Sequence, residues 1–273
     1  GRTLRTLTEG RIVTIQADEI IARVTAQACH QAGLSAVFRD LLDFDGDEIY
    51  FTRIPELDGH AYRDVLHAFE TCTPLGWITR ERVVELNPPP DAVFPDGAEL
   101  VSVAEDDDTV VFTGFVPVPQ ITADTSEPFR EAPVRVLVIG WSDLGPAVLA
   151  ELDEFLAPGS TVDLVVDPEL LAPSADDGAL EPPVPETANA AITTRSVGGG
   201  PEELLDLAAE GYDQAIVLGY RGDIPVGESD ARTMLTLLTL AKAWPSGSGG
   251  PRVVAEMLDR GNRFLVAGRE GSD

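Results

Sequence analysis

The stretch VRVLVIGWSDLGPAVLAEL, residues 134–152, decides the fold class of this chain. It reads as an apolar strand, a tight turn with two glycines, and a helix. After it, continuous apolar strands alternate with amphipathic helices as far as RFLVAG, residues 263–268. Strands that are apolar throughout are typical of a parallel sheet covered by helices on both faces. We therefore expect residues 134–273 to form an α/β lobe around a Rossmann-like parallel sheet, with RFLVAG as its last short strand.

The turn in this stretch resembles a dinucleotide-binding turn, which has the form G-x-G-x-x-G at a strand-to-helix junction. Gly140 and Gly145 occupy the first and third glycine positions, but Ser142 stands at the second, where the backbone would meet the pyrophosphate. Asp143 places a carboxylate beside that position. We therefore interpret the two glycines as residues that allow a tight turn, and a bound dinucleotide is the alternative.

Asp167 follows the second strand of this lobe, where an acidic residue would hold a ribose hydroxyl in a dinucleotide-binding fold. Strand ends also carry Asp because its side chain favours turns, so both roles stay open. The sequence gives no support for hydride transfer. The three histidines, at positions 30, 60 and 67, all precede the sheet and so lie away from its carboxyl edge, where such folds bind their ligands. We expect no NAD cofactor and no enzymatic activity.

The part of the chain before the linker has a different pattern. Residues 18–42 hold two apolar runs at helical spacing, separated by Gly33, and predict a helical hairpin. Short alternating strands and one helix follow as far as Asp108. We expect residues 1–112 to form this α+β module. Residues 113–133, which contain four prolines and no hydrophobic period, are predicted to be a linker.

The charge of the chain excludes one large class of partners. The 273 residues carry a formal net charge of −28, so the chain repels nucleic acid and anionic lipid. Its two cysteines are too few and too far apart for a disulfide scaffold or a thiolate metal site. No apolar run approaches the ~20 residues that cross a bilayer. A role at a membrane would therefore need an anchor elsewhere in the polypeptide.

Four consecutive carboxylates follow an apolar strand near the end of the first module: Glu105, Asp106, Asp107 and Asp108. Neighbouring negative charges repel one another, and a hard cation such as Ca²⁺, which prefers oxygen ligands, would relieve that repulsion. A solvated acidic loop that leads into the linker explains the same residues without a ligand. Both interpretations stay open.

Several long segments can be placed together, and in order, in one known family. The first half carries ADEIIARVTAQACHQAGLSAVFRDLLDF (17–44), PELDGHAYRDVLHAFETCTPLGWI (55–78) and ELNPPPDAVFPDGAELVSVAEDDDT (85–109). The second half carries RVLVIGWSDLGPAVLAELDEFLAPGS (135–160) and YDQAIVLGYRGDIPVGESDARTMLTLLTLAKAW (212–244). The first three resemble the C-terminal lobe of a regulator-of-K⁺-conductance (RCK) unit, with the helical segment before it, in the CASTOR/POLLUX ion-channel family. The last two resemble that family's second, Rossmann-type RCK lobe.

This resemblance implies a regulatory assembly on the cytoplasmic face of a membrane. In the family, RCK units of several identical subunits form a gating ring below a cation-conducting pore, which transmembrane helices of the same polypeptide build. The ring converts ligand binding into pore opening. The family is associated with calcium and potassium permeation and with regulation by Ca²⁺. The chain would begin at the end of a first RCK unit and stop before the last lobe of a second.

Three groups of residues gain a role from the resemblance. The turn from Gly140 to Gly145 matches the family's own GW turn, which also departs from the dinucleotide pattern. The acidic stretch Ala104–Thr109 matches a family segment, which strengthens its interpretation as a metal site. Asp230 and Arg232 match a segment at the start of the helix after the fourth strand. An interface or ligand contact is one reading of that pair, and helix capping by Asp230 is the other.

Three functions compete at this point. The first is a channel gating domain that senses an ion, Ca²⁺ above all, or a small ligand, and that performs no catalysis. The second is a nucleotide-binding regulatory subunit of a K⁺ uptake transporter, which would share RCK-type lobes. The third is an NAD-dependent enzyme, which the lack of a His, Lys or Tyr constellation near the glycine turn disfavours.

Overall fold

The computed structural model describes residues 15–31, 33–43, 46–117, 132–171, 182–198, 200–222, 224–245 and 250–262. The chain divides into two compact units. Residues 1–32 and 129–273 form one, called here the parallel-sheet unit, and residues 33–128 form the other, called the antiparallel unit. Most of the predicted linker and the predicted last strand RFLVAG lie outside the described residues.

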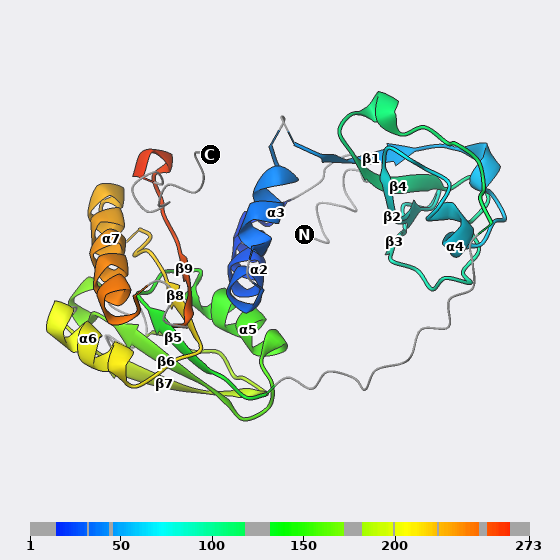
Figure 1. Cartoon of the computed structure of the whole chain (residues 1–273). Coiled ribbons are helices and arrows are strands. Elements are labelled where there is room, and N and C mark those ends of the chain that lie inside the picture. The colour runs from blue at the N-terminus through cyan, green and yellow to red at the C-terminus, as the bar shows by residue number, and fades with distance from the viewer. Residues whose placement is uncertain are drawn as a thin grey trace, which may run out of the picture. The chain divides into compact units, whose positions relative to one another are not determined.

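The parallel-sheet unit contains a five-stranded sheet in the order β7-β6-β5-β8-β9 (Figure 1). β5 (Arg135–Ile139) lies at its centre, between β6 (Ser160–Val166) and β8 (Gln214–Val217). The edges are β7 (Ala190–Ser196) and β9 (Arg252–Ala255). Every neighbouring pair is parallel, which confirms the Rossmann-like lobe predicted from the apolar strands.

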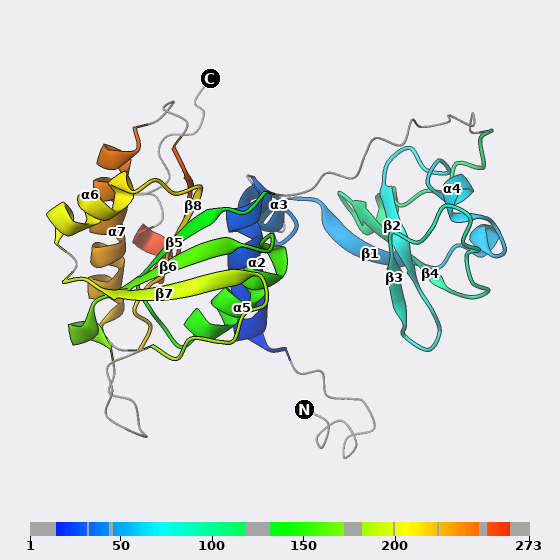
Figure 2. The same cartoon turned by 90° about the horizontal axis from the view of Figure 1, so that it is seen from below.

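Helices cover both faces of this sheet, as Figure 2 shows from below. α2 (Ala17–His30) and α5 (Gly145–Phe155) pack on one face, and α6 (Pro201–Ala209) and α7 (Val226–Ala243) pack on the other. Successive side chains of a strand point to opposite faces. Each face of an apolar strand therefore meets a helix layer, which is why β5 is buried from its second residue to its last. The unit also contains two short 3₁₀ helices, η3 (Pro168–Leu170) and η4 (Arg260–Asn262).

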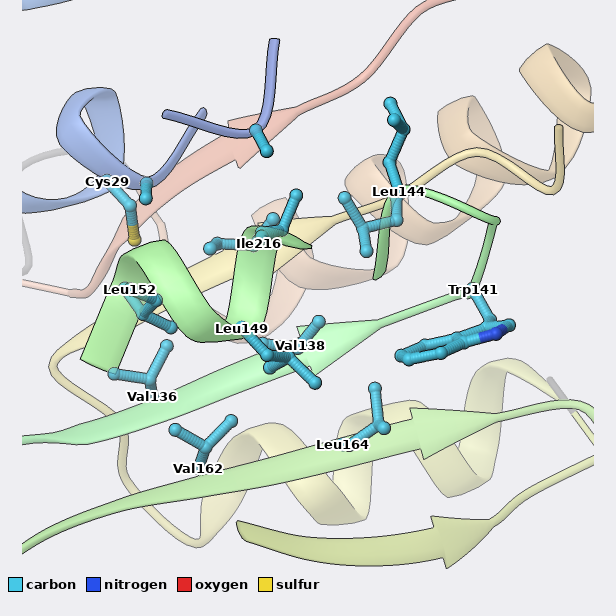
Figure 3. Packing of buried hydrophobic residues seen from close by; sticks show 14 of the residues in the cluster. Cys29, Val136, Val138, Trp141, Leu144, Leu149, Leu152, Val162, Leu164 and Ile216 are labelled. Carbon is cyan, nitrogen blue, oxygen red and sulfur yellow. The ribbon is translucent and has the colours of Figure 1, made fainter. Parts of the chain in front are cut away.

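The predicted hairpin at 18–42 is divided between the two units. α2 belongs to the parallel-sheet unit, whereas α3 (Leu34–Asp40) belongs to the antiparallel unit and buries no residue. Three small residues of α2, Ala22, Ala26 and Cys29, are fully buried in one cluster with residues of α5. Figure 3 shows Cys29 beside α5. Small side chains at this spacing let two helix backbones approach closely, which explains why α2 leaves the module that follows it in sequence.

The thiol of Cys29 provides a direct probe of this docking. Burial raises the pKa of Cys29 to about 12, against a smaller opposing effect of Arg252, and the thiol donates to Oε1 of Gln214 at 3.4 Å. In a Cys72→Ser variant, we expect Cys29 to react with Ellman's reagent at least ~100-fold more slowly in the native than in the unfolded protein. The rate of colour development in native buffer and in denaturant measures this.

A matched pair of substitutions shows whether the protection comes from α2. Ala26→Leu places extra methyl groups in a filled contact, at a cost of about 1–3 kcal/mol, and should speed the reaction of Cys29. Ala36→Leu makes the same change at an exposed position of α3 and should leave the rate unchanged. Rapid labelling of Cys29 in the parent Cys72→Ser protein would contradict the docked position of α2.

The antiparallel unit is built on a four-stranded sheet in the order β1-β4-β2-β3. Its strands are β1 (Glu48–Thr52), β4 (Glu99–Ala104), β2 (Thr73–Ile78) and β3 (Val84–Leu86). Besides α3, the unit contains the four-residue α-helix α4 (Tyr62–Val65) and the 3₁₀ helices η1 (Pro55–Leu57) and η2 (Asp107–Thr109). All strand pairs are antiparallel. The small α+β module predicted from the alternating strands is confirmed.

Aromatic side chains form the centre of this unit. The Trp77 ring meets Tyr62 and Phe94 edge-on, with centroids 5.7 and 5.5 Å apart. Phe94 and Leu100 are fully buried beside them. This core fixes β4, and with it the position at which the chain leaves the sheet and enters the acidic stretch.

Candidate functional site

The acidic stretch begins where β4 ends at Ala104. Asp106 has an extended backbone and caps η2: its Oδ1 accepts a hydrogen bond from the Asp107 amide at 2.7 Å. The Thr109 hydroxyl donates to the Asp106 carbonyl at 2.7 Å and accepts from the Asp106 amide at 3.3 Å. These reciprocal bonds form a capping box, which holds the turn in one conformation.

This turn gathers three carboxylates. Ligand oxygens of Asp106, Asp107 and Asp108 lie within 4.8 Å of one another, and all three residues are exposed. Glu105, the fourth residue predicted for the site, is not part of this group. Carboxylate oxygens are the ligands that Ca²⁺ prefers, and waters can complete its shell at an exposed position. The residues therefore fit a hard cation held from one side.

Strand β1 adds negative charge that was not expected from the sequence. Glu48 pairs with Ala104 in the β1–β4 register, and its Oε2 accepts a hydrogen bond from the Tyr50 hydroxyl at 2.8 Å. That bond is the main cause that raises the pKa of Tyr50 to about 12, followed by burial and by the charges of Glu48, Asp106 and Asp107. Glu48 belongs to the surroundings of the acidic turn, and only the strand register reveals it.

The glycine turn of the parallel-sheet unit is shaped by the chain's own atoms. Gly140 has φ +91°, and a Cβ there would lie 2.2 Å from the carbonyl oxygen of Leu218. Its amide donates to the carbonyl of Val165 at 2.9 Å. The glycine is therefore required where the ends of β5 and β8 approach each other, without any phosphate.

The other positions of the turn are also occupied. A Cβ on Gly145 would lie 2.5 Å from the Trp141 ring, which is buried and lies beside Leu164 of β6 (Figure 3). Ser142 is fully buried, and its Oγ accepts from the Leu144 amide at 3.2 Å. The indole thus packs against the start of α5, where a pyrophosphate would lie in a dinucleotide-binding turn. That this turn binds no dinucleotide stays a prediction.

The neighbouring cavity, at the carboxyl edge of the sheet, is small. Its volume is about 70 Å³, and Asp167, Tyr220 and Arg232 lie in its wall. Small-molecule pockets commonly enclose ~300–1,000 Å³. Asp167 is engaged within the chain, because it accepts from the Glu169 amide at 3.1 Å and faces Arg232 at 3.7 Å. This cavity is therefore too small for a ribose, and the Asp167 carboxylate that would bind its hydroxyl is already occupied by contacts within the chain.

Asp230 and Arg232, which the sequence placed together as an interface or ligand contact, have different environments. Asp230 is fully buried inside α7, four residues after the helix begins, so it is neither a helix cap nor accessible to a ligand. Its carboxylate accepts hydrogen bonds from the Leu258 and Asp259 amides and from Asn262 at 2.8–3.0 Å. Arg232 is exposed and pairs with Asp167 and Glu228. The burial of Asp230 therefore contradicts its predicted role as an interface or ligand contact.

Several curated proteins similar to this chain are named as ion channels. A family model described as Castor and Pollux, part of voltage-gated ion channel, matches residues 18–117. The probable ion channel POLLUX of Arabidopsis thaliana is 28% identical over 236 residues, which cover 84% of this chain and 28% of that protein. The probable ion channel SYM8 of Pisum sativum is 31% identical over 244 residues, which cover 84% and 26%. The chain spans about a quarter of the length of these relatives.

A solved structure shares the fold of almost the whole chain. The human SLO3 gating ring aligns with a TM-score of 0.57 and 14% identity, covering 93% of this chain and 52% of that one. A likeness at this identity concerns the fold alone. Among the described helices, none combines the length and the hydropathy of a membrane span. The matches confirm the resemblance seen in the sequence: this chain is a relative of the CASTOR/POLLUX ion channels and shares its fold with the human SLO3 gating ring.

Proposed function

We propose that this chain is a cytosolic gating module of a cation channel. It senses a cation, Ca²⁺ in the first place, and couples binding to the opening of a pore that transmembrane helices of the same polypeptide form. It works without catalysis, in a ring of identical subunits on the cytoplasmic face of the membrane. The homology to ion channels over 84% of the chain, together with a gating-ring fold, carries this proposal.

The acidic turn is the proposed sensor. Asp106, Asp107 and Asp108 supply the carboxylate oxygens that would hold Ca²⁺, while the capping box fixes the backbone from which they project. Without a cation, their charges repel one another and add to the negative charges of Glu48 and of the whole chain. A bound cation cancels this repulsion, so it stabilises the antiparallel unit.

The connections between the units provide a route for coupling. The chain passes from one unit to the other twice, at residues 32–33 and 128–129. The first crossing follows directly on α2, which is docked on α5 of the parallel-sheet unit. A ligand shifts an equilibrium between arrangements only if it binds one of them more tightly. We propose that Ca²⁺ at the acidic turn favours one arrangement of the two units.

The sensor role predicts a cation-specific stabilisation. Ca²⁺ at about 100 times its dissociation constant should stabilise the protein by roughly 2.7 kcal/mol. The double variant Asp106→Asn/Asp107→Asn removes two of the three carboxylates and should abolish the effect. Thermal unfolding in EDTA and in rising Ca²⁺, with Mg²⁺ and NAD(H) as comparison ligands, measures it. NAD(H) should have no effect, since Trp141 fills the glycine turn.

The control for this experiment removes the same charge from the same unit. Glu81→Gln/Glu85→Gln changes two exposed carboxylates away from the acidic turn and should keep the full response to Ca²⁺. An unchanged Ca²⁺ response in Asp106→Asn/Asp107→Asn would exclude the acidic turn as the sensor. An equal loss in both double variants would show a general effect of net charge instead.

A further inference from the structure

The parallel-sheet unit has another cavity at the opposite edge of the sheet, where the strands begin. Its volume is about 310 Å³. Gln214 and Arg252 border it at the first residues of β8 and β9, and Val134 borders it just before β5. Two helix ends also border it: His30 is the last residue of α2, and Phe155 is the last residue of α5.

The walls of this cavity combine an apolar surface with one cation. Phe155, Leu156 and Val134 supply the apolar part, and the His30 ring stacks on Phe155 with centroids 5.8 Å apart. Arg252 supplies the cation, and its guanidinium donates to the His30 carbonyl. This contact leaves further N–H groups of the guanidinium for another acceptor, since an arginine has five.

Arg252 also differs from most arginines of the described chain. Eight of them lie within ion-pair distance of a carboxylate: Arg23, Arg53, Arg63, Arg82, Arg135, Arg195, Arg221 and Arg232. Among the described residues, Arg252 forms no such ion pair with a carboxylate within 4.0 Å. In a chain of net charge −28, a guanidinium that faces an apolar cavity and has no acidic partner in the described ranges is suited to an anion supplied from outside.

These features limit the ligand to one chemical class. A single guanidinium matches the charge and the shape of a single carboxylate. A phosphate ester with two negative charges would be repelled by the strongly negative chain and would have only this one guanidinium to bind it. The apolar walls require an apolar body. A volume of about 310 Å³ lies at the lower end for ligand pockets, so the body is one ring or a short chain.

We propose that this cavity binds a small apolar monocarboxylate, with its carboxylate on Arg252 and its apolar body against Phe155 and Leu156. Such a ligand contacts α2 at His30 and the sheet at β8 and β9 together. It therefore holds the C-terminal end of α2 on the parallel-sheet unit, three residues before the antiparallel unit begins at Gly33. The effect on gating rests on the proposed function, whereas the binding itself does not.

Benzoate is the probe for this site, and benzyl alcohol is its neutral counterpart. Thermal unfolding of the full chain in EDTA should show a rise with benzoate up to 20 mM and a much smaller one with benzyl alcohol. Arg252→Gln should weaken benzoate binding at least tenfold. Arg82→Gln, which removes an exposed arginine of the antiparallel unit, should leave it unchanged. Benzoate should also slow the labelling of Cys29 in the Cys72→Ser protein.

Several results would overturn the proposal. The first is that benzoate does not stabilise the parent protein. The second is that benzoate stabilises Arg252→Gln as much as the parent. The third is that benzyl alcohol stabilises the parent as much as benzoate does. Ala157→Trp gives a second test, because it fills the cavity from its wall and should remove the response while Arg252 stays in place. The same titration in Asp106→Asn/Asp107→Asn separates the two sites: benzoate should still bind when the response to Ca²⁺ is lost.

Discussion

Gly140→Ala is expected to destabilise the parallel-sheet unit by about 4 kcal/mol or more, the largest effect of any single substitution considered for this chain. Two costs add at this residue. The backbone has φ +91°, which is strained for any residue with a side chain, and the new Cβ would lie 2.2 Å from the Leu218 carbonyl oxygen. That oxygen belongs to the backbone between β8 and α7 and cannot turn away. Denaturant unfolding measures the loss.

Gly211→Ala separates the two costs. Gly211 lies in the same unit and has φ +81°, but no atom lies within 4 Å of the position of its Cβ. We expect it to cost about 1–2 kcal/mol, from the backbone conformation alone. If the two variants lost similar stability, the close approach of β5 and the Leu218 carbonyl would not be the reason for the first glycine of the turn.

Asp230→Asn is expected to cost about 3 kcal/mol at pH 7. The buried carboxylate accepts hydrogen bonds from two backbone amides and from Asn262, whereas the new amide has one acceptor and turns N–H groups toward the remaining donors. The segment 258–262 would then lose its attachment to α7. Urea unfolding of both proteins at pH 7 gives the difference, and Asp206→Asn, at an exposed position of α6, is the control with no expected effect.

The same carboxylate gives this difference a pH dependence. Burial alone would raise the pKa of Asp230, but the hydrogen bonds from Asn262, Leu258 and Asp259 lower it below its ordinary value. Its contribution is therefore complete above the unfolded pKa of about 3.9 and is lost as the pH falls through the folded pKa. The difference between parent and variant should therefore shrink as the pH falls below about 4. A difference that stayed constant down to pH 2 would contradict an ionised, hydrogen-bonded Asp230.

Periodicity was sufficient to predict both sheets but not the partner of α2. Continuous apolar strands predicted the parallel sheet, and alternating strands predicted the antiparallel module, because burial on two faces or on one leaves a distinct pattern. The apolar face of residues 17–30 shows only that this helix packs on something. The partner, α5, lies more than 110 residues along the chain, and no local pattern carries that information.

The candidate sites were predictable to different degrees. The acidic run is visible in the sequence, and three of its four carboxylates meet because a capping box turns the chain at Asp106. The contribution of Glu48 depends on strand register, which the sequence does not show. The need for glycine at position 145 was not predictable, because it arises from the tertiary contact of this residue with the Trp141 ring. Asp230 was expected at the start of its helix, whereas α7 begins four residues earlier, at Val226.

The proposed coupling allows one direct test. Cysteines introduced at Glu81 and Glu202, both exposed and one in each unit, can carry a pair of fluorescent labels in a chain that lacks Cys29 and Cys72. Energy transfer between the labels is then measured in EDTA and in saturating Ca²⁺. A gating module predicts that Ca²⁺ changes the transfer efficiency, and that Asp106→Asn/Asp107→Asn removes the change. Equal transfer with and without Ca²⁺, in a protein that Ca²⁺ demonstrably stabilises, would contradict the proposed coupling.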